Sequence, residues 1–217
     1  MQQSEIKEII CRYIADSLNC TVGQLELEGT FFVRNEKEKS GYLKILSIKD
    51  ANIISLSEDQ EEIGKSALIG KNRDELYESD LIFGQTIHYP STYTFFMYEG
   101  NELMELKNVT GFDNSLVFDE NGHTDTDIVL CARKDGNIFA IASASNVTET
   151  IMEIGVDVKK EYREKGLASL LVKNLTAVLL ERKKVPFYSA SVTNLASQAV
   201  AIRSGYMPFW TDTYGVR

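Results

Sequence analysis

The chain has 217 residues, of which 43% are hydrophobic and 25% charged, a composition typical of a globular protein and unlike that of a disordered chain. We expect neither a signal peptide nor a membrane span, because no apolar run approaches the length that either requires. The three scattered cysteines, Cys11, Cys20 and Cys131, predict reduced thiols in a cytoplasmic protein rather than a disulfide framework.

The net charge of −9 is distributed unevenly along the chain. Residues 1–115 contain 11 Lys and Arg against 20 Asp and Glu, whereas residues 116–217 contain 12 of each. An acidic first half would attract a cationic amine and repel nucleic acid, and a neutral second half suits a polyanionic cofactor. A solvated acidic surface without any recognition role would explain the same distribution, and both interpretations stay open.

The first half predicts a smaller α+β domain, which we place at residues 1–111. Helical periodicity indicates a helix over residues 4–18, with Ser4 as its N-cap, and further helices over 59–68 and 72–81, the last capped by Asn72. Strands are expected at residues 30–33, 42–48, 52–56 and 93–98. This half contains no recognisable chemical motif, so we expect it to serve the substrate side or an interface.

The second half predicts a mixed sheet with two helices. Strands 127–133 and 137–144 flank the turn Lys134-Asp135-Gly136-Asn137, and a third strand, residues 151–158, completes an antiparallel meander. A basic glycine turn then leads into a helix over residues 167–182, and a strand over 187–192 runs parallel to the third strand. Asn194 should cap a helix over 195–203 that ends at Gly205, before a last strand over 206–210.

The turn before the helix at residue 167 predicts an anion site. The first turn of a helix has free backbone N–H groups and the positive end of the helix dipole. Gly166 and Ala168 keep side chains away from anything that binds there.

Here the sequence resembles a known family. Arg163-x-x-Gly166-x-Ala168 is similar to the R/Q-x-x-G-x-G/A signature of the GNAT superfamily of N-acetyltransferases, in which this loop binds the pyrophosphate of acetyl-CoA. The strand EIGVDV, the motif, the strand FYSASV, Asn194-x-x-Ser197 and Gly205-Tyr206 follow one another in the order of that superfamily. The resemblance implies a GNAT domain at residues 112–217, with a mixed sheet that splays between the two strands to admit the thioester arm. Bacterial GNAT proteins with an extra N-terminal domain are the most similar.

The expected cofactor is acetyl-CoA, as a cosubstrate and without a metal, since His88 and His123 have no metal-ligand spacing. Backbone N–H groups near residues 165–169 can hold the pyrophosphate, and the strand edge at 156–158 can pair with the pantetheine arm. The resemblance implies that a backbone N–H near Val156 or Asp157 polarises the thioester carbonyl. The expected cofactor-binding residues are Val156, Asp157, Val158, Arg163, Glu164, Lys165, Gly166, Leu167, Ala168, Ser169, Asn194 and Ser197.

The catalytic residues are less clearly indicated. Glu153 is the first candidate for the general base, because many GNAT enzymes have a carboxylate near that place. Asp157 is the second candidate. Either residue could instead be a solvated strand carboxylate. Many family members have a tyrosine acid at the position that Ala201 occupies here. Tyr188 or Ser197 could replace it, although both could be structural. A thiol of pKa near 8.5 also leaves readily without an acid.

The sequence therefore predicts an enzyme that transfers an acetyl group from acetyl-CoA to a primary amine of a small, cationic molecule by direct attack on the thioester. The alternative is a non-catalytic acyl-CoA-binding or sensing module, which Ala201 favours. We expect no nucleic-acid or membrane partner, and a homodimer is left open.

Overall fold

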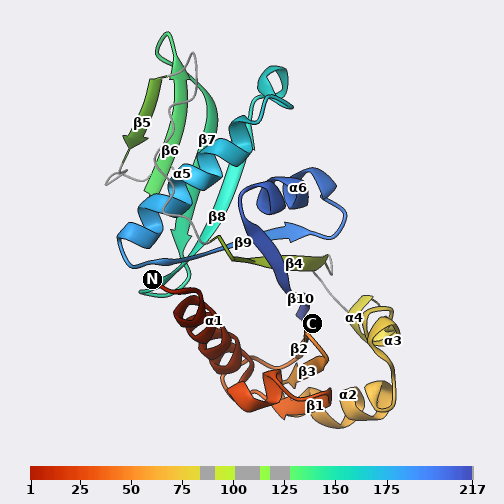
Figure 1. Ribbon diagram of the computed structural model, residues 1–217. Coiled ribbons are helices and arrows are strands. Elements are labelled where there is room, and N and C mark those ends of the chain that lie inside the picture. The colour runs from red at the N-terminus through yellow and green to blue at the C-terminus, as the bar shows by residue number, and fades with distance from the viewer. Residues whose placement is uncertain (84–90, 101–112, 118–127, 217) are drawn as a thin grey trace. The chain divides into compact units, whose positions relative to one another are not determined.

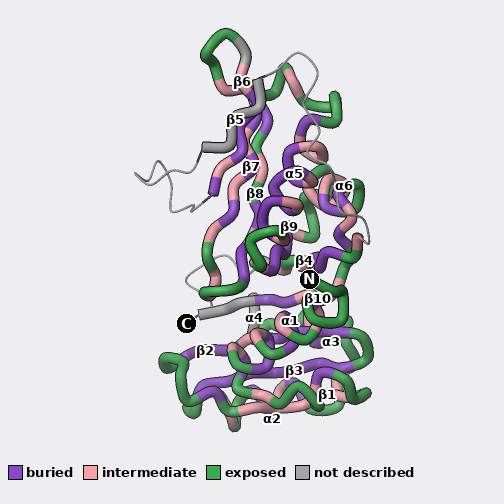
Figure 2. Tube along the Cα trace, turned by 60° about the vertical axis from the view of Figure 1, so that its left-hand side comes forward, coloured by how far each residue is buried: buried purple, intermediate pink, exposed green. Residues whose placement is uncertain are grey.

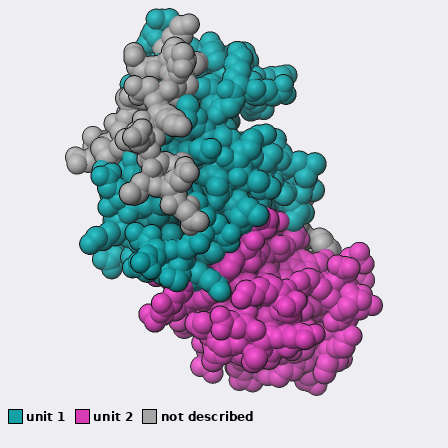
Figure 3. All heavy atoms as spheres, viewed as in Figure 1, with its two compact units in different colours: residues 1–7, 96–207 teal, residues 8–95, 208–217 magenta. Residues whose placement is uncertain are grey.

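The computed structural model describes residues 1–83, 91–100, 113–117 and 128–216, with only the backbone described for 82–83, 91, 113–117, 134 and 214–216. The chain forms two compact units (Figure 3), residues 1–7 and 96–207 in unit 1 and residues 8–95 and 208–217 in unit 2. Three elements cross between the units: helix α1 (Gln3–Leu18) and strands β4 (Ser91–Tyr98) and β10 (Tyr206–Val216).

These units differ from a division of the chain after residue 111. The chain changes unit three times, after residues 7, 95 and 207, and its last residues join the unit that contains most of the first half. Strand pairing causes this, since the end of β10 pairs with an early strand and pairing does not follow chain order. Residue 111 lies outside the described residues, so the functional division into residues 1–111 and 112–217 stays a prediction.

Unit 2 is built on three early strands and the end of β10, in the order β1-β3-β2-β10. Strands β1 (Gly29–Arg34) and β3 (Ala51–Leu56) are parallel, and β2 (Tyr42–Ile48) is antiparallel to both β3 and β10. A short helix, η1 (Val22–Leu25), precedes these strands, and four more follow them: η2 (Glu58–Gln60), α2 (Glu61–Leu68), α3 (Arg73–Tyr77) and α4 (Asp80–Phe83). The buried positions of the strands are purple in Figure 2, and one core cluster joins Leu43, Ile45, Ile54, Leu56, Leu68 and Leu76.

Two predictions about helix ends were wrong in this half. Helix α1 begins at Gln3, because the carbonyl of Gln2 accepts hydrogen bonds from the N–H groups of Glu5 and Ile6; Ser4 therefore lies inside the helix and is not its N-cap. The helix expected over residues 72–81 is divided into α3 and α4. Its predicted cap is confirmed, since Asn72 Oδ1 accepts from the Glu75 N–H at 3.0 Å and a Glu75 carboxylate oxygen accepts from the Asn72 N–H at 2.8 Å.

Unit 1 contains the predicted mixed sheet, with helix α5 (Leu167–Glu181) against it (Figure 1). Strands β5 (Asp113–Val117), β6 (Ile128–Lys134), β7 (Asn137–Asn146) and β8 (Ile151–Val158) form an antiparallel meander, which confirms the prediction and adds β5. The tight turn between β6 and β7 requires positive φ angles, 51° at Asp135 and 76° at Gly136. Strand β9 (Val185–Ser191) follows α5 and lies between β4 and β8.

Strands β8 and β9 pair only along part of their length. The parallel ladder has four pairs, from Ile151 with Val185 to Ile154 with Tyr188, although the two strands continue to Val158 and Ser191. On its other edge, β8 pairs with β7 as far as Val158. Within the described residues, the β9-facing edge of β8 therefore has no strand partner after Ile154, which confirms the predicted splay.

The C-terminal elements are those expected, apart from the length of the last strand. Asn194 Oδ1 accepts from the Ser197 N–H at 3.1 Å and caps helix α6 (Leu195–Arg203), and Gly205, with φ of 91°, follows its end. Strand β10 extends beyond the predicted residue 210 to Val216, because residues 211–216 pair with β2. Among the described residues, no helix combines the length and the apolar character needed to cross a membrane.

Candidate active site

The turn between β8 and α5 contains a helix N-terminus that no side chain caps. After the short helix η3 (Lys160–Tyr162), Glu164 and Gly166 take positive φ angles of 64° and 78°, and α5 begins at Leu167. Within the described part of the chain no side-chain hydrogen bond caps this end, and the first N–H bonded within the helix is that of Leu170, to the Gly166 carbonyl at 3.1 Å. The backbone N–H groups of residues 167–169 are thus donors without helical acceptors.

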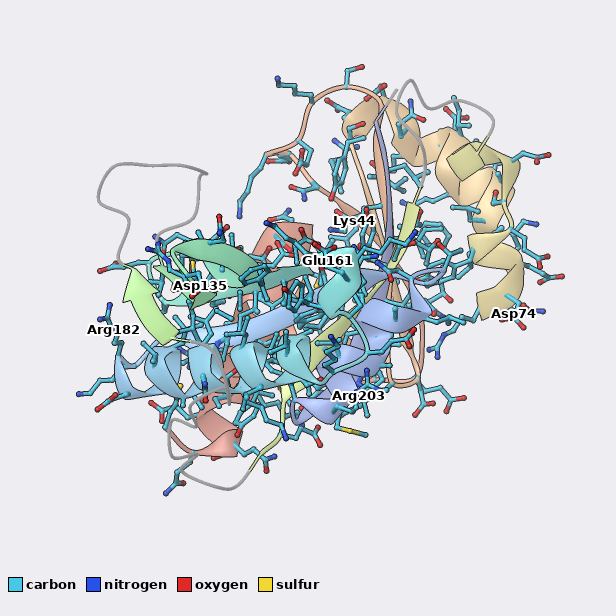
Figure 4. All side chains as sticks on the ribbon, turned by 90° about the horizontal axis from the view of Figure 1, so that it is seen from above. Lys44, Asp74, Asp135, Glu161, Arg182 and Arg203 are labelled. Carbon is cyan, nitrogen blue, oxygen red and sulfur yellow. The ribbon has the colours of Figure 1, made fainter. Side chains whose placement is uncertain are left out.

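The space in front of this N-terminus is open. A Cβ atom added to Gly166 would meet no heavy atom of the described residues within 4 Å. The turn is exposed and holds four cations, Lys159, Lys160, Arg163 and Lys165. Figure 4 labels Glu161 in this turn and Arg182 just past the opposite end of α5.

Aromatic side chains hold two of these lysines beside the turn. Phe139 of β7 packs against Tyr162, with ring centroids 4.3 Å apart. The Lys159 ammonium lies 5.2 Å from the Phe139 centroid, and the Lys165 ammonium lies 5.1 Å from that of Tyr162, both within cation–π range. The turn therefore presents positive charge from a defined scaffold.

Arg163 connects the turn to the end of β8. Its Nε donates to the Val158 carbonyl at 2.9 Å, and its Nη2 lies 3.8 Å from Asp157 Oδ1. The Asp157 side chain is 86% exposed. Asp157 is therefore a solvent-exposed carboxylate next to a cation rather than a group enclosed in a site.

Glu153 lies at the place where the β8–β9 ladder ends. It is half-buried, is paired with Ser145 of β7 and Phe187 of β9, and accepts a hydrogen bond at Oε1 from the Ser189 hydroxyl. The next position on the same face of β8 is Gly155, opposite Ser143, so the neighbouring side chains are small. The carboxylate thus lies beside an uncrowded part of the sheet face.

Tyr188 and Ser197, the two candidate acids, are in contact. Tyr188 Oη lies 2.8 Å from Ser197 Oγ, and the tyrosine is only 2% exposed. Burial raises the pKa of Tyr188, and the hydrogen bond with Ser197 opposes that effect. The phenol is therefore protonated at neutral pH, as a proton donor must be.

Other predicted site residues have structural roles in the described chain. Ala201 is fully buried in α6, so no polar group occupies the position of the usual tyrosine acid. The side-chain oxygen of Asn194 is engaged in the α6 cap, and a cofactor contact for this residue stays a prediction. The described residues contain no group of three or more His, Cys, Asp and Glu able to hold a metal; His88 and His123 lie outside them.

Sequence reasoning missed Ser189. It lies two residues after Phe187 and therefore on the same face of β9 as the residue paired with Glu153. The alternation along FYSASV would have placed it on that face, but only the register between β8 and β9 shows which carboxylate it meets.

The residues that form the turn, the splayed strands and the capped helix α6 match a known protein family. Residues 111–210 match the model of the family described as GNAT acetyltransferase. Residues 111–210 therefore form a GNAT domain. This GNAT domain indicates an N-acetyltransferase, and the acetyltransferases of the family use acetyl-CoA.

Two solved structures are similar to this chain. The GCN5-related N-acetyltransferase-like protein from Streptococcus suis is 17% identical, with a TM-score of 0.52, over 85% of this chain and 87% of that one. A GNAT-family acetyltransferase from Colwellia psychrerythraea is 12% identical, with a TM-score of 0.47, over 76% of each chain. At such identities the similarity concerns the fold alone. No curated protein matches the sequence.

Proposed function

We propose that this GNAT protein transfers the acetyl group of acetyl-CoA to the primary amine of a small, cationic molecule by direct attack of the amine on the thioester. One observation carries the proposal: β8 holds Glu153 where its ladder with β9 ends, and the same strand leads into the uncapped N-terminus of α5. Strand β8 thus contains the candidate base and leads directly to the candidate anion site. The net charge of −9 supports a cationic acceptor.

The turn fits the pyrophosphate of acetyl-CoA on two grounds. The N–H groups of residues 167–169 are donors without helical acceptors, and Gly166 leaves the space before them open. Arg163 and Lys165 add positive charge on exposed side chains. When bound, acetyl-CoA supplies an activated acyl group, and these residues orient it.

The free edge of β8 suits the pantetheine arm. Residues 155–157 of this edge lie beyond the last pair with β9, so their backbone groups on that side can bond an amide-bearing chain as another strand would. The Val158 carbonyl already accepts from Arg163 Nε. The Val156 N–H faces this edge, whereas the Asp157 N–H faces β7, so Val156 is the residue placed to donate to the thioester carbonyl oxygen.

Glu153 is the better candidate for the base. It is half-buried beside the opening, whereas Asp157 is 86% exposed and lies next to Arg163. In this role Glu153 takes a proton from the acceptor ammonium, directly or through water, and so frees the amine lone pair for attack.

Tyr188 is the proposed acid for the departing thiolate. Tyr188→Phe is expected to lower kcat about tenfold to 10²-fold without changing acetyl-CoA affinity, because proton donation is lost and the ring is kept. Burial raises the pKa of Tyr188, so this group keeps its proton above pH 10 and should produce no alkaline limb below that pH. Ser197→Ala is the control, since it removes the hydrogen-bond partner and leaves the phenol. An unchanged kcat in Tyr188→Phe would mean that the thiolate leaves unaided.

The decisive assay measures release of free CoA from acetyl-CoA in the presence of polyamines, amino acids and aromatic monoamines. We expect turnover above hydrolysis with at least one cationic amine, and none with Gly166→Asp at the same acetyl-CoA concentration. The buried Ala201, which leaves the usual acid position without a polar group, favours one competing function, an acyl-CoA sensor. Tight acetyl-CoA binding without turnover across the panel would support that sensor and contradict the proposed transfer.

A further inference from the structure

Ser189 of β9 contacts the proposed base through its side chain. Its hydroxyl donates to Oε1 of Glu153 across the gap between the two strands. We propose that Ser189 is a positioning residue that holds the Glu153 carboxylate in one orientation beside the end of the β8–β9 ladder. This inference rests on the proposed function, in which Glu153 is the general base.

This hydrogen bond lies where the backbone pairing between β8 and β9 ends. The backbone ladder ends with the pair of Ile154 and Tyr188, so Ser189 is the first residue of β9 beyond it. The hydrogen bond from Ser189 to Glu153 therefore connects β8 and β9 where backbone pairing has stopped. Of the two carboxylate oxygens, Oε1 is occupied by this bond, and Oε2 is left for the acceptor.

A hydrogen bond from a hydroxyl restricts a carboxylate side chain that otherwise has several rotamers, and a base must be oriented before the ammonium arrives. Removing the hydroxyl should therefore leave the base less well oriented and slow the chemical step.

The test separates kcat from KM with an amine found in the assay above. Ser189→Ala is expected to lower kcat about tenfold at neutral pH and to leave KM for the amine unchanged, because the base is less well oriented while the binding groups are kept. Acetyl-CoA affinity, measured by calorimetry, should not change. Ser189→Thr, which keeps a hydroxyl, should restore kcat.

Ser145→Ala is the matched control, because Ser145 is also a half-buried serine and pairs with Glu153 on the opposite strand. It should behave like the unmodified protein. If Ser189→Ala does not fold, Ser189→Cys keeps the size of the side chain with a much weaker donor and should give the same loss of kcat.

The outcomes separate the two proposals. If Glu153→Gln keeps kcat and the acidic limb of the pH–rate profile, Glu153 is not the base and the proposed mechanism fails. If Glu153→Gln lowers kcat and abolishes that limb while Ser189→Ala or Ser189→Cys keeps the full kcat, only the positioning role of Ser189 is overturned. An equal loss of kcat in Ser145→Ala would also overturn it.

Discussion

Replacing Gly166 by aspartate is expected to weaken acetyl-CoA binding by at least about 10²-fold, which corresponds to the loss of one or two hydrogen bonds to a charged group. The new carboxylate would project into the open space before α5, where it would compete for the N–H groups of residues 167–169 and repel the pyrophosphate. Titration calorimetry with acetyl-CoA measures the effect directly.

Two control variants distinguish the loss of affinity caused by the added charge from the loss caused by placing a side chain at a positive φ angle. Gly166→Asn has nearly the same shape as the aspartate variant and also tolerates the φ of 78°, so its smaller loss of affinity would report the steric part alone. Gly136→Asp places a carboxylate at a glycine with φ of 76° and equally open surroundings among the described residues, in the β6–β7 turn, and should leave binding unchanged. Normal binding by Gly166→Asp would mean that the phosphates bind elsewhere.

Glu153→Gln is expected to lower kcat on the order of 10²-fold, the typical contribution of a positioned base, and to abolish the acidic limb of the pH–rate profile. Acetyl-CoA affinity should be kept, because the amide oxygen of glutamine can still accept the hydrogen bond from Ser189 and the strand geometry is preserved. The measurement is the pH dependence of kcat with an amine from the screen.

Asp157→Asn is the comparison for that experiment. Asp157 is exposed and lies beside Arg163, so its amide variant should retain most of kcat and the acidic limb. A Glu153→Gln protein with near-normal kcat and an unchanged limb would contradict the assignment. The base would then be Asp157 or a residue of the N-terminal half.

The sequence by itself determined the local elements of the site. The helical spacing of the leucines after Gly166, the alternation in EIGVDV and the turn at Asp135 and Gly136 are periodicities within a few residues, and each appears in the structure as α5, β8 or the β6–β7 turn. The cap at Asn194 was predictable for the same reason, because a cap involves residues only three apart.

Only the tertiary structure decided how those elements meet. The end of the β8–β9 ladder at Ile154 and Tyr188, the hydrogen bond from Ser189 to Glu153 and the contact of Tyr188 with Ser197 all depend on strand register or on packing between elements. The same holds for β10, whose end pairs with β2 about 170 residues earlier in the chain. Such pairings are set by which side chains pack across the whole sheet, and no local periodicity in the sequence specifies them.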